Sequence, residues 1–529
     1  MTGHPATGRL PDGAISPALI AAINRIIPPD EWPSGWDGGV GGYLERTNPD
    51  LGWAWPMLDS LAGRLAALGF VDLDDVGRDA ALAELDTDAT AAVEFAALRR
   101  LCWEGYYAAR PGAAPAGLEM VGFRPVPAGV TPIEPQLPES INVSGVRRSY
   151  DAIIIGSGPG GGAVARALTE AGRHILLIER SRRHGSTELR IDHLHGKRNA
   201  VYAPSAGPGA GHPRQIESDA GVVEVDGDGD AALYGLNAMV FGGGTRLWQG
   251  MAWRFMPEDF RMVSTYGNPE GASLADWPVD YAEMEPFYAR AERELGVAGE
   301  EGALTARTPR TSDYPLPAMG TEPAREVLAA GAERLGWGWG PIPLAVNTRP
   351  SEGRPACVRC PQCVGHACPV DAKNGSHNTM IPRAMASGNC DLLMDAEVIE
   401  VRDGPRHASV TVMAESSGSP TRLEVYADFV IVAAGAVETP RLLLASGLGN
   451  DQMGRHLHDH RFVTVMSTID RPAKDFLGPG HSIATRDHEH GTSIPWGGGV
   501  LVDLMGILPL TSASDPPMPG VPRWGAGHK

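Results

Sequence analysis

The chain has 529 residues, of which 43% are hydrophobic and 21% are charged, a composition typical of globular proteins with more than one core. Its formal net charge is −19, so its surface repels phosphates and nucleic-acid binding is not expected. Six cysteines in a chain of this length do not make a disulfide scaffold.

Residues 1–124 read as a small helical domain. Apolar residues recur three and four positions apart in three segments, which predicts helices over Pro17–Ile27, Pro56–Phe70 and Asp86–Tyr107. The domain is therefore expected to be all-α, with its apolar helix faces turned toward one core.

The flanks of this helical domain carry further signals. Asp86 or Thr87 can cap the third helix. Residues 125–146 are rich in proline without sustained periodicity, and we predict a linker there. The N-terminus has no basic patch before an apolar run, and no apolar run reaches the length of a membrane span. We therefore expect a cytoplasmic protein without a transmembrane segment.

The segment after the linker has a dinucleotide-binding pattern. A predicted strand, Tyr150–Ile155, leads into Gly156-x-Gly158-x-x-Gly161, then a helix, then a second strand that ends at Glu179. The first glycine makes a tight turn, the second lets the backbone approach a pyrophosphate, and the third allows helix and strand to pack closely. The terminal carboxylate can bind ribose hydroxyls. Pro159, Gly160 and Arg180 complete the contacts predicted in this segment.

Two later segments favour FAD as the dinucleotide. Phe429–Ala433 is a predicted strand that continues into Ala434 and Gly435. In two-dinucleotide flavoproteins, a strand of this kind returns beside the first strand, and its Ala-Gly end lies near the cofactor. Glu397–Val401 is a predicted strand beside the adenine, with Val398 as the contact. The predicted fold class is α/β: a Rossmann-like domain with a parallel sheet and a substrate or cap domain, preceded by the helical domain.

Gly243-Gly244-Thr245 adds a motif that identifies a family. Together with the dinucleotide pattern and AAGAVETPRLLLASG (Ala433–Gly447), it resembles the glucose–methanol–choline (GMC) family of FAD oxidoreductases. Arg190–His195 and Gly454–His460 also fit. The resemblance covers roughly residues 147–510. It implies that the Gly243–Thr245 turn lies against the flavin and that Gly435 and Thr439 lie near the cofactor. The implied divisions are an FAD-binding domain at 147–455, a cysteine-rich insertion at 354–373 and an apparently incomplete substrate domain at 456–529.

The helical domain carries a second resemblance. Arg25–Leu44 and Trp103–Tyr107 are similar to the small subunit of gluconate 2-dehydrogenase. In that family this subunit accompanies a flavin-bearing large subunit, so the resemblance implies a fusion of the two in one chain. It favours a dehydrogenase that passes electrons to a cytochrome, a quinone or another acceptor.

Four of the six cysteines are clustered. Cys357, Cys360, Cys363 and Cys368 have the spacing C-x2-C-x2-C-x4-C-P, one residue away from a ferredoxin pattern. Three interpretations are open: an iron–sulfur cluster, a zinc knuckle, or structural thiols or local disulfides that hold a loop. Some GMC relatives hold a three-iron cluster in a similar segment. Cys102 and Cys390 are expected to be core residues.

The catalytic residue of the family is not found. The resemblance implies a histidine over flavin N5, in a C-terminal stretch with an Asn-Pro motif that this sequence does not show. His488-x-x-Gly491-Thr492 resembles such a site only superficially, and His456, His458 and His460 look structural. Three explanations are open: a shortened form, a second polypeptide that supplies the base, or a non-catalytic relative. We favour the second and therefore expect a hetero-oligomer.

The sequence thus predicts an FAD-dependent oxidoreductase that acts on CH–OH groups. Hydride would pass to flavin N5 from an alcohol, with a sugar, glycoside or polyol as the expected substrate. The alternatives are an oxygen-using oxidase and a catalytically silent flavin-binding subunit. NAD-linked reduction on a plain Rossmann domain is a further alternative, against which the Gly243–Thr245 turn argues.

Overall fold

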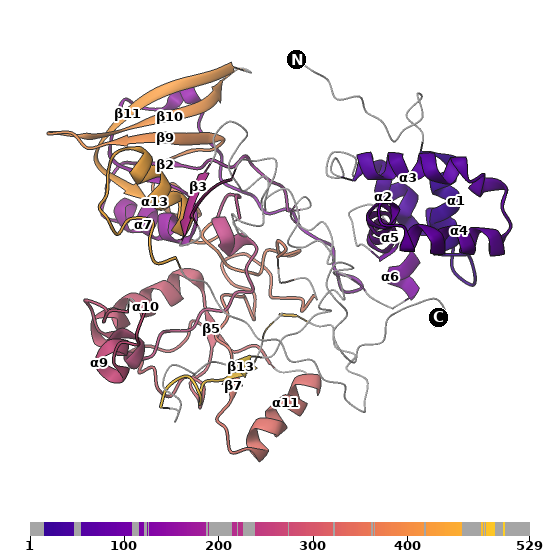
Figure 1. Cartoon of the computed structure of the whole chain (residues 1–529). Helices are drawn as coiled ribbons and strands as arrows, with labels where there is room; N and C mark the ends of the chain where they lie inside the picture. The colour runs from indigo at the N-terminus through magenta and orange to yellow at the C-terminus, as the bar shows by residue number, and fades with distance from the viewer. Residues whose placement is uncertain are drawn as a thin grey trace. The chain divides into compact units, whose positions relative to one another are not determined.

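The structure is a computed structural model of the whole chain (Figure 1). It describes residues 15–46, 54–107, 116–120, 124, 126–186, 189, 214–218, 221–225, 238–272, 274–320, 323–360, 363, 365–416, 419–457, 478–479, 481, 483–491 and 501–502. The described residues up to 124 form one compact unit and those from 126 onward form a second. Each unit is described by itself.

The first unit is a helical bundle around one apolar core. Leu58, Leu61 and Leu65 line one face of α3, at the spacing of a helical stripe, and are fully buried with Leu98 of α5. The helices and helical turns are α1 (Pro17–Ile26), η1 (Trp36–Val40), α2 (Gly41–Arg46), α3 (Trp55–Ala67), η3 (Phe70–Asp72), α4 (Asp75–Thr87), α5 (Ala91–Tyr107) and α6 (Ala116–Met120).

The predicted helices correspond to α1, α3 and α5, but the predicted start of the third helix is wrong. Asp86 and Thr87 are the last residues of α4, a helix that the sequence analysis missed. Asp88 is the residue that caps α5, because its Oδ1 accepts hydrogen bonds from the amides of Thr90 (2.9 Å) and Ala91 (2.7 Å). Two helices therefore meet at a single aspartate.

The second unit is built on a six-stranded sheet with the order β8-β2-β1-β11-β10-β9. The strands are β1 (Ser149–Ile155), β2 (Ile175–Ile178), β8 (Cys390–Leu393), β9 (Ala396–Arg402), β10 (Ala408–Ser416) and β11 (Ser419–Val432). β8, β2, β1 and β11 are parallel to one another, whereas β10 is antiparallel to both β11 and β9. The α/β prediction, with a mostly parallel sheet, is confirmed.

The sheet buries both faces. On one face, Ile154 and Leu177 share a core with residues of α7 (Pro159–Glu170) and α12 (Met380–Ala386). On the other, Ile153 and Ile155 share a core with the antiparallel strands and with α13 (Gly435–Ala445). Strands covered on both faces read as continuous apolar runs, which is why Tyr150–Ile155 was recognisable from the sequence. Figure 1 shows α7 and α13 beside the strands.

Smaller elements complete the second unit. They are α9 (Met262–Tyr266), α10 (Tyr281–Leu295), α11 (Pro323–Arg334), β3 (Arg214–Ser218), β4 (Gly221–Val225), β5 (Ala298–Gly299), β6 (Leu316–Pro317), β7 (Gly340–Pro341), β12 (Ile483–Thr485) and β13 (Leu501–Val502). None of the helices in the described residues combines the length and apolar character that crossing a bilayer requires.

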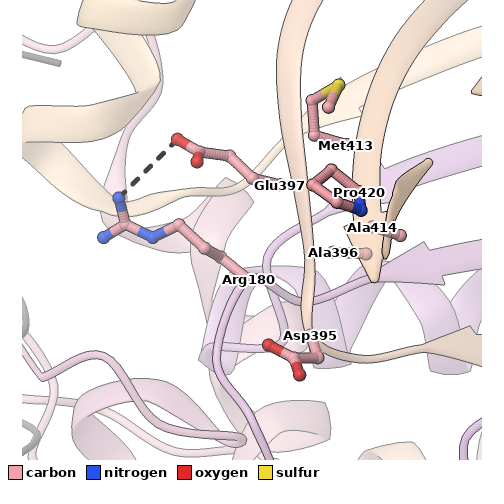
Figure 2. A pocket seen from close by; sticks show the side chains of 7 residues that line it. All are labelled: Arg180, Asp395, Ala396, Glu397, Met413, Ala414 and Pro420. Atoms are coloured by element: carbon pink, nitrogen blue, oxygen red, sulfur yellow. Dashed lines mark ion pairs between the residues drawn. The ribbon is translucent and has the colours of Figure 1, made fainter. Parts of the chain in front are cut away.

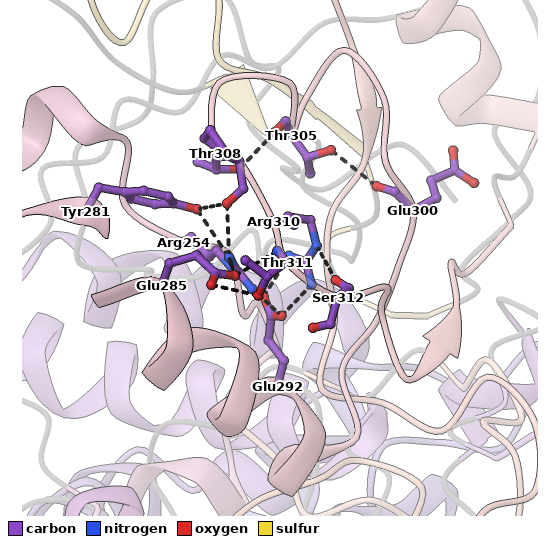
Figure 3. Close-up of polar contacts among 11 residues, drawn as sticks. Arg254, Tyr281, Glu285, Glu292, Glu300, Thr305, Thr308, Arg310, Thr311 and Ser312 are labelled. Atoms are coloured by element: carbon purple, nitrogen blue, oxygen red, sulfur yellow. Dashed lines mark hydrogen bonds and ion pairs between the residues drawn. The ribbon is translucent and has the colours of Figure 1, made fainter. Parts of the chain in front are cut away.

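A buried ionic cluster joins α10 to the loop that follows it (Figure 3). The guanidinium of Arg254 donates two hydrogen bonds of 2.9 Å to Glu292 and one of 2.9 Å to Glu285. Arg310 also binds Glu292, at 2.9 and 2.5 Å. All four side chains are buried or nearly so, and each charge faces an opposite charge, which is the condition for burying ions.

Candidate functional site

The turn between β1 and α7 has the geometry of a dinucleotide-binding turn. Gly156 has φ +102°, a conformation that favours glycine, and an added Cβ would lie 2.5 Å from the carbonyl oxygen of Ala433. α7 begins at Pro159, and its N-cap residue Gly158 provides no side-chain cap. The amides at this helix end therefore have no side-chain partner at the cap and are placed to bind an anion.

The other two motif glycines differ in what surrounds them. A Cβ on Gly161 would lie 1.9 Å from the carbonyl oxygen of Gly156, so this glycine lets α7 pack against β1. A Cβ on Gly158 would meet nothing within 4 Å. Gly158 thus leaves open space beside the backbone, on the side where a ligand can approach.

Glu179 directly follows β2 and is 8% exposed. Its carboxylate accepts hydrogen bonds from the Ser157 amide (3.0 Å), the Ser157 hydroxyl (2.5 Å) and the Ser181 amide (2.8 Å). A carboxylate has about four acceptor positions. Three of these positions are thus occupied by protein donors, and one is left for a ribose hydroxyl.

The Gly243–Thr245 motif forms a 3-10 turn next to the first turn. Gly242 and Gly243 have φ of +94° and +56°, and a Cβ on Gly243 would lie 2.9 Å from Cα of Gly158. The Gly242 amide donates to the Ser157 hydroxyl at 2.9 Å, and Thr245 Oγ1 donates to the Gly242 carbonyl at 2.7 Å. The two glycine-rich turns are thereby fixed against each other.

The carboxyl end of β11 forms a third turn. Gly435 has φ +88°, and a Cβ there would meet nothing within 4 Å. Thr439, one turn into α13, accepts a hydrogen bond from the Ala434 amide at 3.1 Å through its hydroxyl oxygen. This turn is thus held by its own helix and leaves its glycine open.

These turns enclose a pocket of about 410 Å³, which we name the glycine pocket. Its described lining residues include twelve of the fourteen predicted cofactor contacts: Gly156, Gly158, Pro159, Gly160, Glu179, Arg180, Gly243, Gly244, Val398, Ala434, Gly435 and Thr439. The other two, Gly161 and Thr245, do not line it; both pack inside the protein and shape the turns.

A second hollow of about 490 Å³ adjoins the glycine pocket (Figure 2). The two share Arg180, Ala396 and Glu397. The guanidinium of Arg180 lies 4.0 Å from the carboxylate of Glu397 and 3.8 Å from that of Glu438. These two ion pairs keep the guanidinium where the two hollows meet. An extended ligand can therefore occupy one continuous surface from the glycine turns to the β9–β10 strands.

The sequence analysis missed two serines that join these parts. Ser157 lies inside the motif, and Ser376 is fully buried after the cysteine-rich segment. The Ser376 hydroxyl donates to the Ser157 carbonyl at 2.7 Å, and its amide donates to Thr245 Oγ1 at 3.2 Å. The first contact spans 219 residues, so no local pattern could have revealed it.

The cysteine cluster does not form a preformed metal site. None of the six cysteines is in a disulfide. Among the residues that the structure describes, no three cysteine sulfurs lie within 4.8 Å of one another. Burial raises the pKa of Cys357 to about 12. The iron–sulfur prediction for Cys357, Cys360, Cys363 and Cys368 is not supported.

A lysine organises the cysteine-rich segment instead. Lys373 is 3% exposed, and its Nζ donates hydrogen bonds of 2.8 Å to the carbonyl oxygens of Cys363 and His366. Burial lowers the pKa of Lys373, against an opposing influence of the four cysteines. The segment continues directly into Ser376, so its fold places that serine against the glycine turns.

No described histidine lines the glycine pocket. His456 is exposed and contacts Gln452, and His488 is exposed with its ring against Trp337. His377 is buried beside Gly242; burial, aided by nearby Arg246 and other cations, lowers the pKa of His377 well below 6.5. His458, His460 and the segment 190–195 lie outside the described residues.

One further group has metal-ligand chemistry. Asp259, Glu489 and His490 bring three ligand atoms within 4.8 Å of one another. The His490 ring contacts Asp259 and Tyr266, each at 3.0 Å, and Glu489 forms an ion pair with Arg486. Each of these three side chains already has a protein partner, so the cluster connects the segments that carry them.

Comparison with known proteins agrees with this geometry. Residues 231–462 match the family described as GMC oxidoreductase. The matched region contains the Gly243–Thr245 turn, the cysteine-rich segment, β9, β10, β11 and α13.

Three curated relatives are similar over much of the chain. The fructose dehydrogenase large subunit of Gluconobacter japonicus is 29% identical over 59% of this chain and 58% of its own length. Paromamine 6'-oxidase of Streptomyces fradiae is 28% identical over 70% and 66%. The gluconate 2-dehydrogenase flavoprotein of Pantoea cypripedii is 26% identical over 74% and 70%. The chain thus spans between 58% and 70% of these relatives' lengths.

Proposed function

Because this chain carries a domain of the GMC oxidoreductase family, we propose that it binds FAD and takes part in the oxidation of a CH–OH group. FAD, when bound, accepts a hydride from the carbon that bears the hydroxyl group. The observation that supports the proposal is the glycine pocket, where three glycine turns from distant parts of the sequence leave their backbone open on one side.

The residues present fit an FAD molecule in extended form. The N-terminus of α7 suits the pyrophosphate, because backbone amides and the helix dipole attract negative charge. Glu179 has one acceptor position for a ribose hydroxyl. Val398 and Ala396 offer an apolar surface for the adenine. Gly244 and Gly435, where an added Cβ would meet nothing within 4 Å, admit a flat ring system close to the backbone.

NAD is the weaker alternative as the bound dinucleotide. A plain Rossmann site uses the first glycine turn and the carboxylate after the second strand. Here two additional turns, Gly243–Thr245 and Ala434–Gly435, line the same pocket. A bound FAD would contact all three turns, which is why we favour FAD over NAD.

We infer that the substrate is an alcohol group of a sugar, glycoside or polyol, since the names of the relatives refer to a sugar, a sugar acid and an aminoglycoside. We propose a cytochrome, a quinone or a similar carrier as the electron acceptor, since two of the relatives are named as dehydrogenases. An oxygen-using oxidase is the rival, because one relative is named as an oxidase. Peroxide release during turnover distinguishes the two.

The proton acceptor of this reaction comes from outside the described residues. None of the histidines that the structure describes lines the pocket, and the carboxylate of Glu179 is engaged by Ser157 and Ser181. The two other carboxylates of the pocket, Glu397 and Glu438, face the guanidinium of Arg180 at 4.0 and 3.8 Å. We propose a second polypeptide as its source. The competing proposal is a non-catalytic flavin-binding subunit, and it is favoured if no alcohol reduces the flavin in any complex of this chain.

A glycine substitution tests the FAD site. Gly158→Val places a side chain into space that is empty of protein atoms for 4 Å, so the fold is expected to be retained while the pyrophosphate is excluded. We expect FAD affinity to fall at least about 100-fold, since amide and dipole contacts to the phosphates are lost together. Fluorescence titration with FAD measures this.

The matched control is Gly63→Ala, a substitution at another open glycine, in α3 of the first unit. It is expected to leave FAD affinity unchanged. Equal FAD affinity of the Gly158→Val protein and the wild type would remove the glycine pocket as the FAD site.

A further inference from the structure

Part of the predicted linker is packed against the second unit. This part is residues 133–141, which we name the strap. The side chain of Leu137 is 6% exposed and shares an apolar core with Ile154 of β1. The Ile141 amide donates a hydrogen bond of 2.7 Å to the Leu392 carbonyl of β8. The strap is therefore attached to the sheet by both its side chains and its backbone.

The strap also holds the segment that follows β2. The Glu134 carboxylate accepts a hydrogen bond of 2.6 Å from the Ser186 amide, and the guanidinium of Arg183 donates to the Leu137 carbonyl. Ser186 is 1% exposed, so removal of the Glu134 carboxylate would take the acceptor away from a buried amide. Residues 181–186 are thus attached to the strap at two points.

The segment held by the strap begins beside the carboxylate that we propose for ribose binding. The Ser181 amide donates to the Glu179 carboxylate at 2.8 Å, and the Ser181 carbonyl accepts from the Asp395 amide at 3.2 Å. Arg180, which lies between Glu179 and Ser181 in the sequence, lines both hollows. A shift of residues 181–186 would therefore move a donor that orients the Glu179 carboxylate.

A further contact connects the strap to the cysteine-rich segment. The Ile133 amide donates to the Pro369 carbonyl at 2.8 Å. The same segment continues to Ser376, whose hydroxyl donates to the Ser157 carbonyl at 2.7 Å. The strap thus contacts two segments from separate parts of the chain, one leading away from Glu179 and one leading to the glycine turns. No strap residue is among the described residues that line the glycine pocket, so any influence on a ligand is indirect.

We propose that the strap positions the cofactor site, with Glu134 as the positioning residue. By holding residues 181–186, Glu134 keeps the Glu179 carboxylate aimed at the place of a ribose hydroxyl. The geometry of a binding group depends on the contacts that support it, and a small displacement is enough to lose a hydrogen bond. The inference rests on the proposed function, because it takes the adenosine part of FAD as the ligand of Glu179.

The test compares full-length wild type with Glu134→Ala, Glu134→Gln and Glu139→Ala. Alanine removes the acceptor of the Ser186 amide, whereas the side-chain oxygen of glutamine can still accept. Glu134 is itself exposed, so the fold is expected to tolerate both changes. Glu139→Ala removes the same charge from another exposed strap residue and is the matched control. Ile133→Pro, which removes the donor to the Pro369 carbonyl, is a second variant that breaks a different contact.

Calorimetric titration measures binding of FAD, ADP and 2′,3′-dideoxy-ADP, which lacks the ribose hydroxyls that Glu179 would bind. Wild type should prefer ADP to the dideoxy compound at least about 10-fold, as expected for a hydrogen bond to a charged group. Glu134→Ala should reduce this preference to below about threefold and weaken FAD binding about 10-fold. Glu134→Gln and Glu139→Ala should match wild type. Hydrogen exchange of residues 181–186 should become at least about 10-fold faster in Glu134→Ala, because a buried amide loses its acceptor.

Faster exchange in Glu134→Ala with an unchanged preference for ADP would overturn the inference, because the strap would then be purely structural. Equal losses in Glu134→Ala and Glu139→Ala would overturn it as well, and so would a wild type without any preference for ADP. If Glu134→Ala does not fold, Ile133→Pro decides: FAD binding should weaken and exchange at residues 369–376 should quicken, and unchanged FAD affinity would contradict the inference. A wild type that shows the ADP preference but does not bind FAD would overturn the proposed function and not the role of the strap.

Discussion

At the scale of single residues, the candidate site depends on hydrogen bonds that stabilise loops against one another. The Ser157 hydroxyl donates to Glu179 and accepts from the Gly242 amide, and its carbonyl accepts from Ser376. Three segments of the sequence thus meet at one serine. Because each of these groups is buried, breaking one contact leaves an unpaired polar atom, which costs roughly 1–3 kcal/mol.

Ser376→Ala tests this connection. The substitution removes the donor to the Ser157 carbonyl and frees the two glycine turns to move apart. We expect FAD affinity to fall roughly 5- to 150-fold, which corresponds to the 1–3 kcal/mol of an unpaired buried group. Fluorescence titration measures the affinity. Ser387→Ala also removes a serine hydrogen bond, at the end of α12, and should leave FAD affinity unchanged. Equal losses in both variants would show that the Ser376 contact has no specific role.

Residue patterns anticipated part of this site. The glycines and Glu179 were recognisable because their roles depend on local geometry, a tight turn and a strand end. Ser157 and Ser376 were not, since a serine acquires its role from partners that only the fold brings close. The cysteine spacing left three interpretations open, and it could not reveal Lys373, whose ammonium group binds the carbonyls of Cys363 and His366 in the folded segment.

At the scale of elements, α10 depends on its buried ionic cluster. Although burial acts to raise it, hydrogen bonds from Arg254 and Arg310 lower the pKa of Glu292 below its ordinary 4.5. The pKa of Glu285 is lowered in the same way, with burial opposed by hydrogen bonds from Thr311 and Arg254. A carboxyl with a depressed pKa in the fold stabilises the protein above its unfolded pKa, and this stabilisation is lost as the pH falls.

We therefore expect the free energy of unfolding to decrease as the pH falls below about 4.5. Glu292→Gln leaves two buried guanidinium groups short of a counter-charge, and at pH 7 it should cost about 3–5 kcal/mol. It should also flatten the acid dependence. Urea unfolding at pH 7 and pH 4 measures both effects. Glu170→Gln removes an exposed partner of Arg290 and should cost at most about 1 kcal/mol. A cost this small for Glu292→Gln would show that the cluster does not stabilise α10.

A glycine inside α3 offers a stabilising change. Gly63 lies in the helix interior, and an added Cβ would meet nothing within 4 Å. Gly63→Ala should raise the free energy of unfolding by about 0.5–1 kcal/mol, because alanine loses less backbone freedom on folding. Chemical denaturation of the first unit's helices, followed by circular dichroism, measures this. A destabilising effect would mean that the open space beside Gly63 is used by another part of the protein.

Element boundaries show where sequence reasoning failed. The parallel strands were predicted well because burial on both faces makes them continuous apolar runs. The start of α5 was misplaced, since Asp86, Thr87 and Asp88 are all cap-type residues and only the hydrogen bonds of Asp88 distinguish them. The order of the strands in the sheet could not be predicted at all, because strand pairing is a property of the sheet and not of the single strand.

At the scale of the whole molecule, the chain combines a helical unit and a flavoprotein-like unit. The proposed fusion with a small-subunit-like domain, the location in the cytoplasm and the second polypeptide stay predictions. The fusion and the second polypeptide are connected, since a dehydrogenase that passes electrons to a separate carrier would need both a docking module and a complete active site.

The most direct test of the central claim is an anaerobic visible spectrum of the native complex before and after addition of sugar alcohols and sugars. The account predicts flavin absorption that bleaches with at least one of them, and no bleaching in the Gly158→Val protein, which lacks the cofactor. A complex that holds FAD and is not reduced by any sugar, glycoside or polyol would contradict the proposed oxidation of CH–OH groups.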